Sequence, residues 1–132
     1  MIITNPVNIK YLTNIESEGT LLITRKENIF LTYTMYIEDV NRTLTIDDEI
    51  IVVDSRDVSL EEAQNFFVFC ENIGFEENYV TYEQYKRLKQ RYRVNNMAET
   101  EGIIEKMRMQ ITADGTIIIS TLPSRERKLI NS

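Results

Sequence analysis

Short apolar runs alternate with helix-start signals along this chain, with no linker between them, and this alternation restricts the fold more than any other feature. The runs at residues 1–4, 19–24, 28–33 and 49–54 are rich in Ile, Leu, Val and Thr, a composition typical of strands. Strands that alternate with helical segments are characteristic of mixed α/β domains. We therefore expect the 132 residues to form a single α/β domain with a mixed central sheet flanked by helices.

Two of the strand runs have the spacing of a hairpin. Residues 19–24 and 28–33 are separated only by residues 25–27, which suits an antiparallel connection. Residues 49–54 form the clearest strand, and their continuous apolar character predicts a central position that is buried on both faces of the sheet.

Helix signals occupy the segments between these strands. Asn5 and Pro6 begin a predicted helix, because Asn is a good N-cap and Pro suits the first helical position. Its expected apolar face is formed by Val7, Tyr11 and Leu12. A second helix is predicted over residues 35–43, because Tyr36 and Val40 lie one helical turn apart.

The segment from residue 59 carries the strongest helix signal. Ser59 and Glu62 have the spacing of a capping box, and Gly74 is a suitable residue to end a helix. The apolar residues between them keep the spacing of a core-facing stripe: Ala63, Phe66, Phe67, Cys70 and Ile73. The sequence therefore predicts a helix over residues 59–73, with Cys70 as a buried and inert thiol.

Three further elements are predicted before residue 110. Residues 78–80 are strand-like, and Thr81 with Gln84 forms a second capping box. Asn96 and Glu99 predict the cap of another helix. The expected buried residues are Tyr85, Leu88 and Tyr92 on the first of these helices and Ile103, Ile104 and Met107 on the second.

The C-terminal segment differs in character from the rest. Asp114-Gly115, between the apolar runs 111–113 and 116–119, predicts a β-hairpin because both turn residues accept positive φ. Residues 124–132 form a polar, basic tail. The chain is therefore expected to consist of a domain over residues 1–109 and a C-terminal β-hairpin with its tail over residues 110–132.

The chain contains no histidine, and this absence excludes several classes of catalytic and metal-binding site. Without His there is no Ser-His or Cys-His pair and no imidazole metal site. The acidic run at residues 47–49 lacks the ligand spacing of a calcium loop, so a solvated turn is expected there. A single Cys and no secretory signal predict a cytoplasmic protein, and no apolar run is long enough to suggest a membrane partner.

Charge is unevenly distributed along the chain. Residues 1–80 contain 5 basic and 15 acidic side chains, whereas residues 81–132 contain 10 basic and 6 acidic ones. The basic segment at residues 86–93 is interleaved with tyrosines, a pattern that suits nucleic-acid binding. The tyrosines fall close to one helical face, however, which is typical of a solvated surface helix. We expect no nucleic-acid partner, with salt-sensitive RNA binding as an alternative.

Several short motifs occur in the order found in a known family. They are residues 8–13, 19–24, 30–32, 36–38, 73–77, 81–85 and 104–108. Together they resemble the N-terminal domain of the creatinase/prolidase group, which includes Xaa-Pro aminopeptidases and Xaa-Pro dipeptidases. The resemblance covers roughly residues 1–109 and implies a mixed α/β fold with a central sheet.

The chain departs from the family pattern at three places. Relatives carry a helix before the first strand, so this chain is expected to begin inside the domain. They tend to have Asp and Arg where this chain has Tyr33 and Met35, next to Tyr36. We therefore single out Tyr33, Met35 and Tyr36 as candidate residues of an interface or a substrate entrance. After Met109 the family continues toward a catalytic domain, whereas this chain carries the hairpin signal.

The resemblance implies a non-catalytic role in substrate access and oligomer contacts. In the family, two divalent metal ions, manganese or cobalt, are held by two Asp, one His and two Glu of the catalytic domain, a set that this chain cannot complete. We expect no catalytic, cofactor-binding or metal-binding residue here. The expected partners are the catalytic domain or another copy of the chain, with a proline-containing peptide only in the full-length context. The alternative is a stand-alone protein-interaction module that keeps the fold without peptidase activity.

Overall fold

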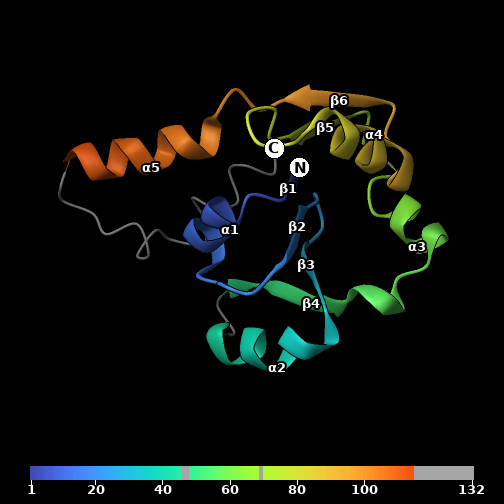
Figure 1. Ribbon diagram of the computed structural model, residues 1–132, viewed down its shortest axis with the longest axis horizontal. Coiled ribbons are helices and arrows are strands. Elements are labelled where there is room, and N and C mark those ends of the chain that lie inside the picture. The colour runs from blue at the N-terminus through green and yellow to red at the C-terminus, as the bar shows by residue number, and fades with distance from the viewer. Residues whose placement is uncertain (46–47, 69, 115–132) are drawn as a thin grey trace.

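The computed structural model describes residues 1–45, 48–68 and 70–114, with side chains described up to residue 108. Within these residues six strands form one sheet in the order β4-β3-β2-β1-β5-β6 (Figure 1). The strands are β1 (Ile2–Ile3), β2 (Gly19–Ile23), β3 (Asn28–Thr32), β4 (Ile50–Asp54), β5 (Asn72–Phe75) and β6 (Asn96–Glu99). The helices are α1 (Pro6–Thr13), α2 (Thr34–Thr43), α3 (Leu60–Asn65), α4 (Tyr82–Arg91) and α5 (Ile103–Asp114). The predicted single α/β domain is confirmed.

The sheet is mixed, as predicted. β2 pairs antiparallel with β1 and β3, while β4, β5 and β6 join their neighbours in parallel. The predicted hairpin is confirmed as β2–β3, in which Leu21 lies opposite Phe30. The predicted central position of residues 49–54 is wrong, because among the described residues β4 pairs only with β3 and forms an edge of the sheet. The prediction of burial on both faces is also wrong, since Ile51 is 47% exposed.

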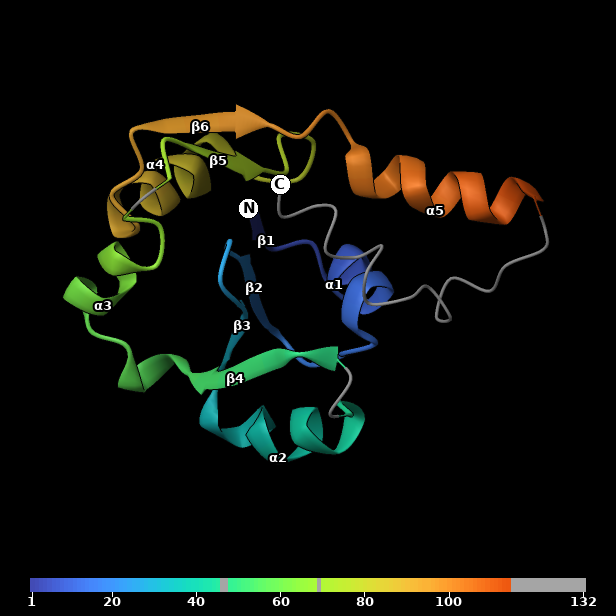
Figure 2. The same cartoon turned by 180° about the vertical axis from the view of Figure 1, so that it is seen from behind.

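Apolar side chains pack on both faces of this sheet. One layer joins the sheet to α1, α2 and α5, and its fully buried residues include Ile3, Ile9, Leu21, Phe30, Val40 and Ile104. The other layer joins the sheet to α3 and to the end of α4, and includes Ile2, Leu22, Ile29, Ala63, Phe67 and Tyr92. Figure 2 shows α1 and α5 on one side of the strands and α3 and α4 on the other. Each buried Ile, Leu or Phe contributes about 1.5–3 kcal/mol of transfer free energy.

The helix caps read from the sequence are largely confirmed. The side chain of Asn5 accepts a hydrogen bond from Val7 N at 3.0 Å, and Pro6 is the first residue of α1. Thr81 and Gln84 form the complete capping box of α4. Val7 was wrongly placed on the buried face of α1, since its side chain is 59% exposed.

The predicted helix over residues 59–73 is wrong beyond Asn65. Ser59 does cap α3, but the helix ends at Asn65, and Asn72–Phe75 form β5. Ile73 is therefore a strand residue, and Gly74 lies opposite Ala98 in β6 and does not end a helix. A Cβ atom at Gly74 would lie 3.0 Å from Thr100 Cγ2, so close packing of the neighbouring segment explains the glycine.

Three later predictions also differ from the structure. Residues 78–80 form a turn, and the strand lies before them as β5. Residues 96–99 form β6, because α4 connects β5 to a second parallel strand and not to another helix. Residues 111–114 continue α5, so the first strand of the predicted hairpin is not formed. Residues 115–119 and the basic tail lie outside the described residues.

Candidate functional site

The residues singled out as a candidate interface lie at the junction between β3 and α2. Tyr33 is the N-cap residue of α2, and Met35 and Tyr36 lie in its first turn. The rings of Tyr33 and Tyr36 contact each other, with centroids 6.3 Å apart and planes at 59°. Tyr33 is 50% and Met35 75% exposed, whereas Tyr36 packs against the core layer under α1, α2 and α5. The structure therefore leaves two large apolar side chains exposed over a partly buried tyrosine, and we call these three residues the Tyr33–Met35 surface.

The backbone next to this surface is linked to Asp54 at the end of β4. The Thr34 hydroxyl donates a hydrogen bond to one Asp54 carboxylate oxygen, and the backbone N–H of Arg56 donates to the other at 2.9 Å. These contacts join the start of α2 to the end of β4. The bond from Thr34 and, after it, the bond from the Arg56 backbone hold the pKa of Asp54 below its ordinary value. Asp54 is the N-cap of the 3-10 turn Ser55–Asp57, and through Thr34 it also contacts the first residue of α2.

A buried threonine fixes the same junction from the side of β3. Thr32 is 1% exposed, and its hydroxyl donates a hydrogen bond to the backbone carbonyl of Glu18 at 2.7 Å. β3 therefore cannot shift relative to the segment that leads into β2 without breaking a buried hydrogen bond. The side chains of Thr32 and Thr34, on either side of Tyr33, are therefore both hydrogen-bonded to neighbouring segments.

A second polar arrangement surrounds Glu76, whose side chain is only 4% exposed. One carboxylate oxygen accepts from the backbone N–H groups of Thr4 at 2.6 Å and Asn5 at 3.0 Å. The other accepts from the side-chain amide of Asn8 at 2.6 Å, and the same amide group donates to Glu105 at 2.8 Å. Glu76 therefore links the segments that begin α1 and follow β5, and Asn8 extends the link to α5.

These carboxylates accept hydrogen bonds that hold segments of the fold together. Glu76 sits at the start of α1, where the N–H groups and the helix dipole favour a negative charge. The adjacent Glu77 accepts from the backbone N–H of Thr100 at 2.9 Å, just before α5. This arrangement cannot be predicted from the sequence, because Glu76 and Asn8 are 68 residues apart and neither side chain belongs to a local motif.

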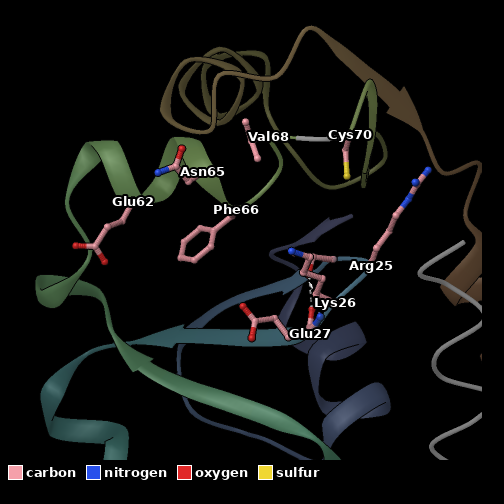
Figure 3. A pocket seen from close by; sticks show the side chains of 9 residues that line it. Arg25, Lys26, Glu27, Glu62, Asn65, Phe66, Val68 and Cys70 are labelled. Carbon is pink, nitrogen blue, oxygen red and sulfur yellow. Dashed lines mark hydrogen bonds between the residues drawn. The ribbon is translucent and has the colours of Figure 1, made fainter.

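A pocket of about 430 Å³ lies between the β2–β3 turn and the segment after α3. Figure 3 shows Phe66 and Cys70 on one side and the turn residues Lys26 and Glu27 on the other. Cys70 is half-buried. Acidic, basic and apolar side chains are mixed along the wall, and none of the lining residues is a histidine. The described wall of the pocket therefore contains no Cys-His pair.

The basic helix predicted around residues 86–93 is α4, which is exposed along most of its length. Tyr82 stacks on Tyr85 with centroids 6.3 Å apart, and Lys86 Nζ lies 4.8 Å from the centre of the Tyr82 ring. Arg87 forms an ion pair with Glu83 one turn earlier. The Tyr82 ring and the charged groups of Lys86 and Arg87 therefore already contact other side chains of α4.

No group of three or more Cys, Asp or Glu side chains converges within the described ranges in a way that could hold a metal ion. The carboxylate of Glu76 already accepts hydrogen bonds from three donors, so this buried site does not fit a metal. The described part of the chain therefore contains no ligand set for the divalent ions that the resemblance implies. In that same part, no helix has the length and apolar character needed to cross a membrane.

Comparison with known families agrees with the order of elements. The Creatinase/Prolidase N-terminal domain family matches residues 1–110, which is most of the chain. The chain therefore belongs to the Creatinase/Prolidase N-terminal domain family. A comparison with curated protein sequences found no significant match.

Solved structures share this fold at low sequence identity. An Xaa-Pro aminopeptidase from Streptococcus thermophilus is 24% identical with a TM-score of 0.65, covering 82% of this chain and 83% of that one. The N-terminal domain of the cytoplasmic peptidase PepQ from Mycobacterium tuberculosis is 22% identical with a TM-score of 0.67, over 82% and 85% of the two chains. An Xaa-Pro dipeptidase from Bacillus anthracis is 22% identical with a TM-score of 0.68 over 86% of this chain, which spans only 34% of that enzyme.

Proposed function

We propose that this chain is a non-catalytic N-terminal domain of an Xaa-Pro aminopeptidase- or dipeptidase-like metallopeptidase, and that it contributes to substrate access and oligomer contacts. The observation that carries the proposal is the family match over residues 1–110. It is supported by the alignment to one third of an Xaa-Pro dipeptidase, which leaves most of that enzyme outside the matched region.

The Tyr33–Met35 surface is the part of the domain that we assign to this role. The Met35 side chain is 75% exposed, so it buries little apolar area and contributes little to the stability of the domain. Because Thr34 and Thr32 fix the backbone on either side of Tyr33, the surface is preorganised for a partner. The partner is either the catalytic domain or another copy of this chain, and a proline-containing peptide would be met only in the full-length context.

The proposed location is the cytoplasm. It is supported by the single cysteine, which is typical of a reducing compartment, and by the similar domain of a peptidase described as cytoplasmic.

A peptidase assay tests the proposal directly. The full chain is incubated with manganese or cobalt and an Xaa-Pro peptide, and release of the first residue is followed. We expect no turnover above the buffer with metal alone. Turnover that rises in proportion to the protein concentration would overturn the non-catalytic assignment.

The same exposed side chains also favour a second candidate, a stand-alone protein-interaction module. The family resemblance leads us to expect Asp and Arg at the positions of Tyr33 and Met35, where this chain instead exposes two large side chains. Such a replacement favours contact with a protein over contact with solvent. The coding region after Ser132 separates the two candidates, since only the first requires two Asp, one His and two Glu in metal-binding order.

A further inference from the structure

Helix α4 carries a concentrated positive charge on a chain that is acidic overall. Residues 81–93 contain five basic side chains and one acidic side chain, whereas the whole chain has a net charge of −6. All five basic residues are exposed. The inner side of α4, which lies beside β5 in Figure 1, is formed by Tyr85, Leu88 and Tyr92, which pack toward the sheet. The positive charge therefore faces away from the core.

Three of these cations follow one another at intervals of one helical turn. Lys86 and Lys89 are three residues apart, and Arg93 follows four residues later in the turn that ends α4. In a helix these intervals correspond to about 4.5 and 6 Å along the axis. We call Lys86, Lys89 and Arg93 the α4 cation stripe.

Within the described residues, none of the three stripe cations forms an ion pair. The neighbouring Arg87 does pair, with Glu83 one turn earlier. Lys86 lies over the Tyr82 ring, a contact that leaves its positive charge without an anion. The stripe therefore presents three cations to solvent on a chain that contains 21 acidic side chains.

The needs of the helix explain only part of this stripe. The helix dipole favours cations in the last turn, which accounts for Lys89. It does not account for Lys86 in the middle of α4, because like charges one turn apart destabilise a helix. Arg93 has a φ of 53°, a left-handed conformation that normally takes Gly or Asn at the end of a helix. Residues held in such conformations are concentrated at functional sites.

We propose that the α4 cation stripe is a docking surface for a short acidic peptide segment of another protein, bound through its Asp or Glu carboxylates. An extended segment places every second side chain on the same side, at intervals of about 6.6 Å. Three alternate acidic residues therefore match the spacing of the stripe within the reach of its long side chains. The stripe lies over the opposite face of the sheet from α2, so this inference goes beyond the function proposed above.

A short acidic peptide suits the stripe better than a nucleic acid does. Proteins that bind single strands without sequence preference combine positive charge with aromatic faces on which bases stack. The Tyr82 ring beside the stripe already contacts Lys86 and Tyr85. A long polyanion would also extend onto a chain whose first 80 residues contain 15 acidic and 5 basic side chains. A short peptide ends where the positive charge ends.

NMR titration of the full ¹⁵N-labelled chain with acetylated hexaglutamate is the first test. We expect chemical-shift changes confined to α4 and the turn that follows it. The dissociation constant should rise as the salt concentration is raised from about 0.05 to 0.3 M, because exposed charges are screened. Since the chain is itself negative, general attraction cannot produce this binding. The absence of shift changes on α4, or changes spread over the whole domain, would overturn the proposal.

Charge reversal within the stripe tests its location. Lys89→Glu should raise the dissociation constant for hexaglutamate at least about fivefold. Lys106→Glu is the matched control, because it makes the same change of charge at an exposed position on α5. The control should leave the dissociation constant within about twofold of the wild-type value. Equal weakening by the two variants would show a general effect of net charge and would overturn the assignment to α4.

Arg93→Gly separates docking from a structural role. Glycine adopts a positive φ without strain, so the urea midpoint of this variant should not fall below that of the wild type. Its affinity for hexaglutamate should nevertheless decrease, because one of the three cations is lost. Unchanged affinity would remove Arg93 from the surface and overturn the three-cation stripe.

A six-nucleotide oligouridylate, titrated under the same conditions, tests the class of partner. We expect it to bind more weakly than hexaglutamate. Equal or tighter binding of the RNA would overturn the assignment of an acidic peptide. None of these measurements depends on peptidase turnover, so the failure of this inference and the failure of the proposed function are distinguishable.

Discussion

The carboxylate of Glu76 accepts a hydrogen bond of 2.6 Å from the side-chain amide of Asn8, and the two residues are 68 positions apart in the chain. Both side chains are almost completely buried. Because the same amide also donates to Glu105, the start of α1, the end of β5 and the first turn of α5 are joined through one polar contact. The position of α5 therefore depends on residues from both halves of the domain.

Replacing this carboxylate should destabilise the whole domain. In Glu76→Gln one amide N–H group must face the N–H donors of Thr4, Asn5 or Asn8, which leaves buried donors without an acceptor. We expect the free energy of unfolding to fall by about 1–3 kcal/mol in urea denaturation. Glu71→Gln, at an exposed position, is the control and should be nearly neutral. Equal stability of the two variants would show that the Glu76 contacts do not hold the domain together.

The Thr34–Asp54 contact predicts a pH-dependent effect. Thr34→Val removes the hydroxyl donor, so the pKa of Asp54 should rise toward its ordinary value in an NMR titration. A lowered carboxyl pKa stabilises the folded state above the unfolded pKa of about 4, and this contribution is lost as the pH falls through the lower folded pKa. The stability difference between wild type and Thr34→Val should therefore be present at neutral pH and shrink in acid. Thr34→Ser, which keeps the hydroxyl, should behave as the wild type, and a Ser variant as perturbed as the Val variant would argue against the hydrogen bond.

Gly19 should be intolerant of any side chain. A Cβ atom there would meet the Phe30 ring and lie 2.5 Å from the carbonyl oxygen of Leu31, a backbone atom that cannot move aside. We expect Gly19→Ala to lower stability by about 1–3 kcal/mol, the usual cost of overpacking. Gly74→Ala is an informative comparison, because its nearest neighbour is the Thr100 side chain at 3.0 Å. Thermal unfolding of both variants should show the larger loss for Gly19→Ala, and the reverse order would contradict this account.

The three residues of the Tyr33–Met35 surface should separate into two classes. Tyr33→Asp and Met35→Arg, which introduce the residue types that the family resemblance leads us to expect, should change stability by no more than about 0.5 kcal/mol because both side chains are exposed. Tyr36→Ala should cost about 2 kcal/mol, because Tyr36 packs against the core. Chemical denaturation measures all three. A large loss for Tyr33→Asp or Met35→Arg would mean that these residues serve the fold and not a surface.

The sequence predicted elements well where the signal was local. The Asn5-Pro6 start of α1 and the Thr81–Gln84 capping box involve residues within one turn of each other, and both were found. β5 was not predicted, because Phe67 and Ile73 also fit the apolar stripe of a helix. Only the pairing of Asn72–Phe75 with β1 and β6 identifies this segment as a strand. A stripe of apolar residues does not by itself distinguish a long helix from a short helix followed by a buried strand.

The edge position of β4 could not be predicted for a related reason. A continuous apolar run is typical of a strand covered on both faces, but it does not say whether a neighbour pairs on each side. Ile51 is exposed because it belongs to neither packed layer, which the apolar run by itself does not reveal. The candidate surface was found from its departure from the family pattern at Tyr33 and Met35, whereas the Asp54 and Glu76 contacts required the fold.

The account depends most on the claim that this domain does not itself hold the metal ions of a peptidase. Isothermal titration of the full chain with manganese measures this directly, with a chelator-treated sample as the reference. We predict no saturable heat, because the buried carboxylates already accept hydrogen bonds and no ligand cluster forms in the described residues. Tight uptake of manganese at a fixed stoichiometry would contradict the claim.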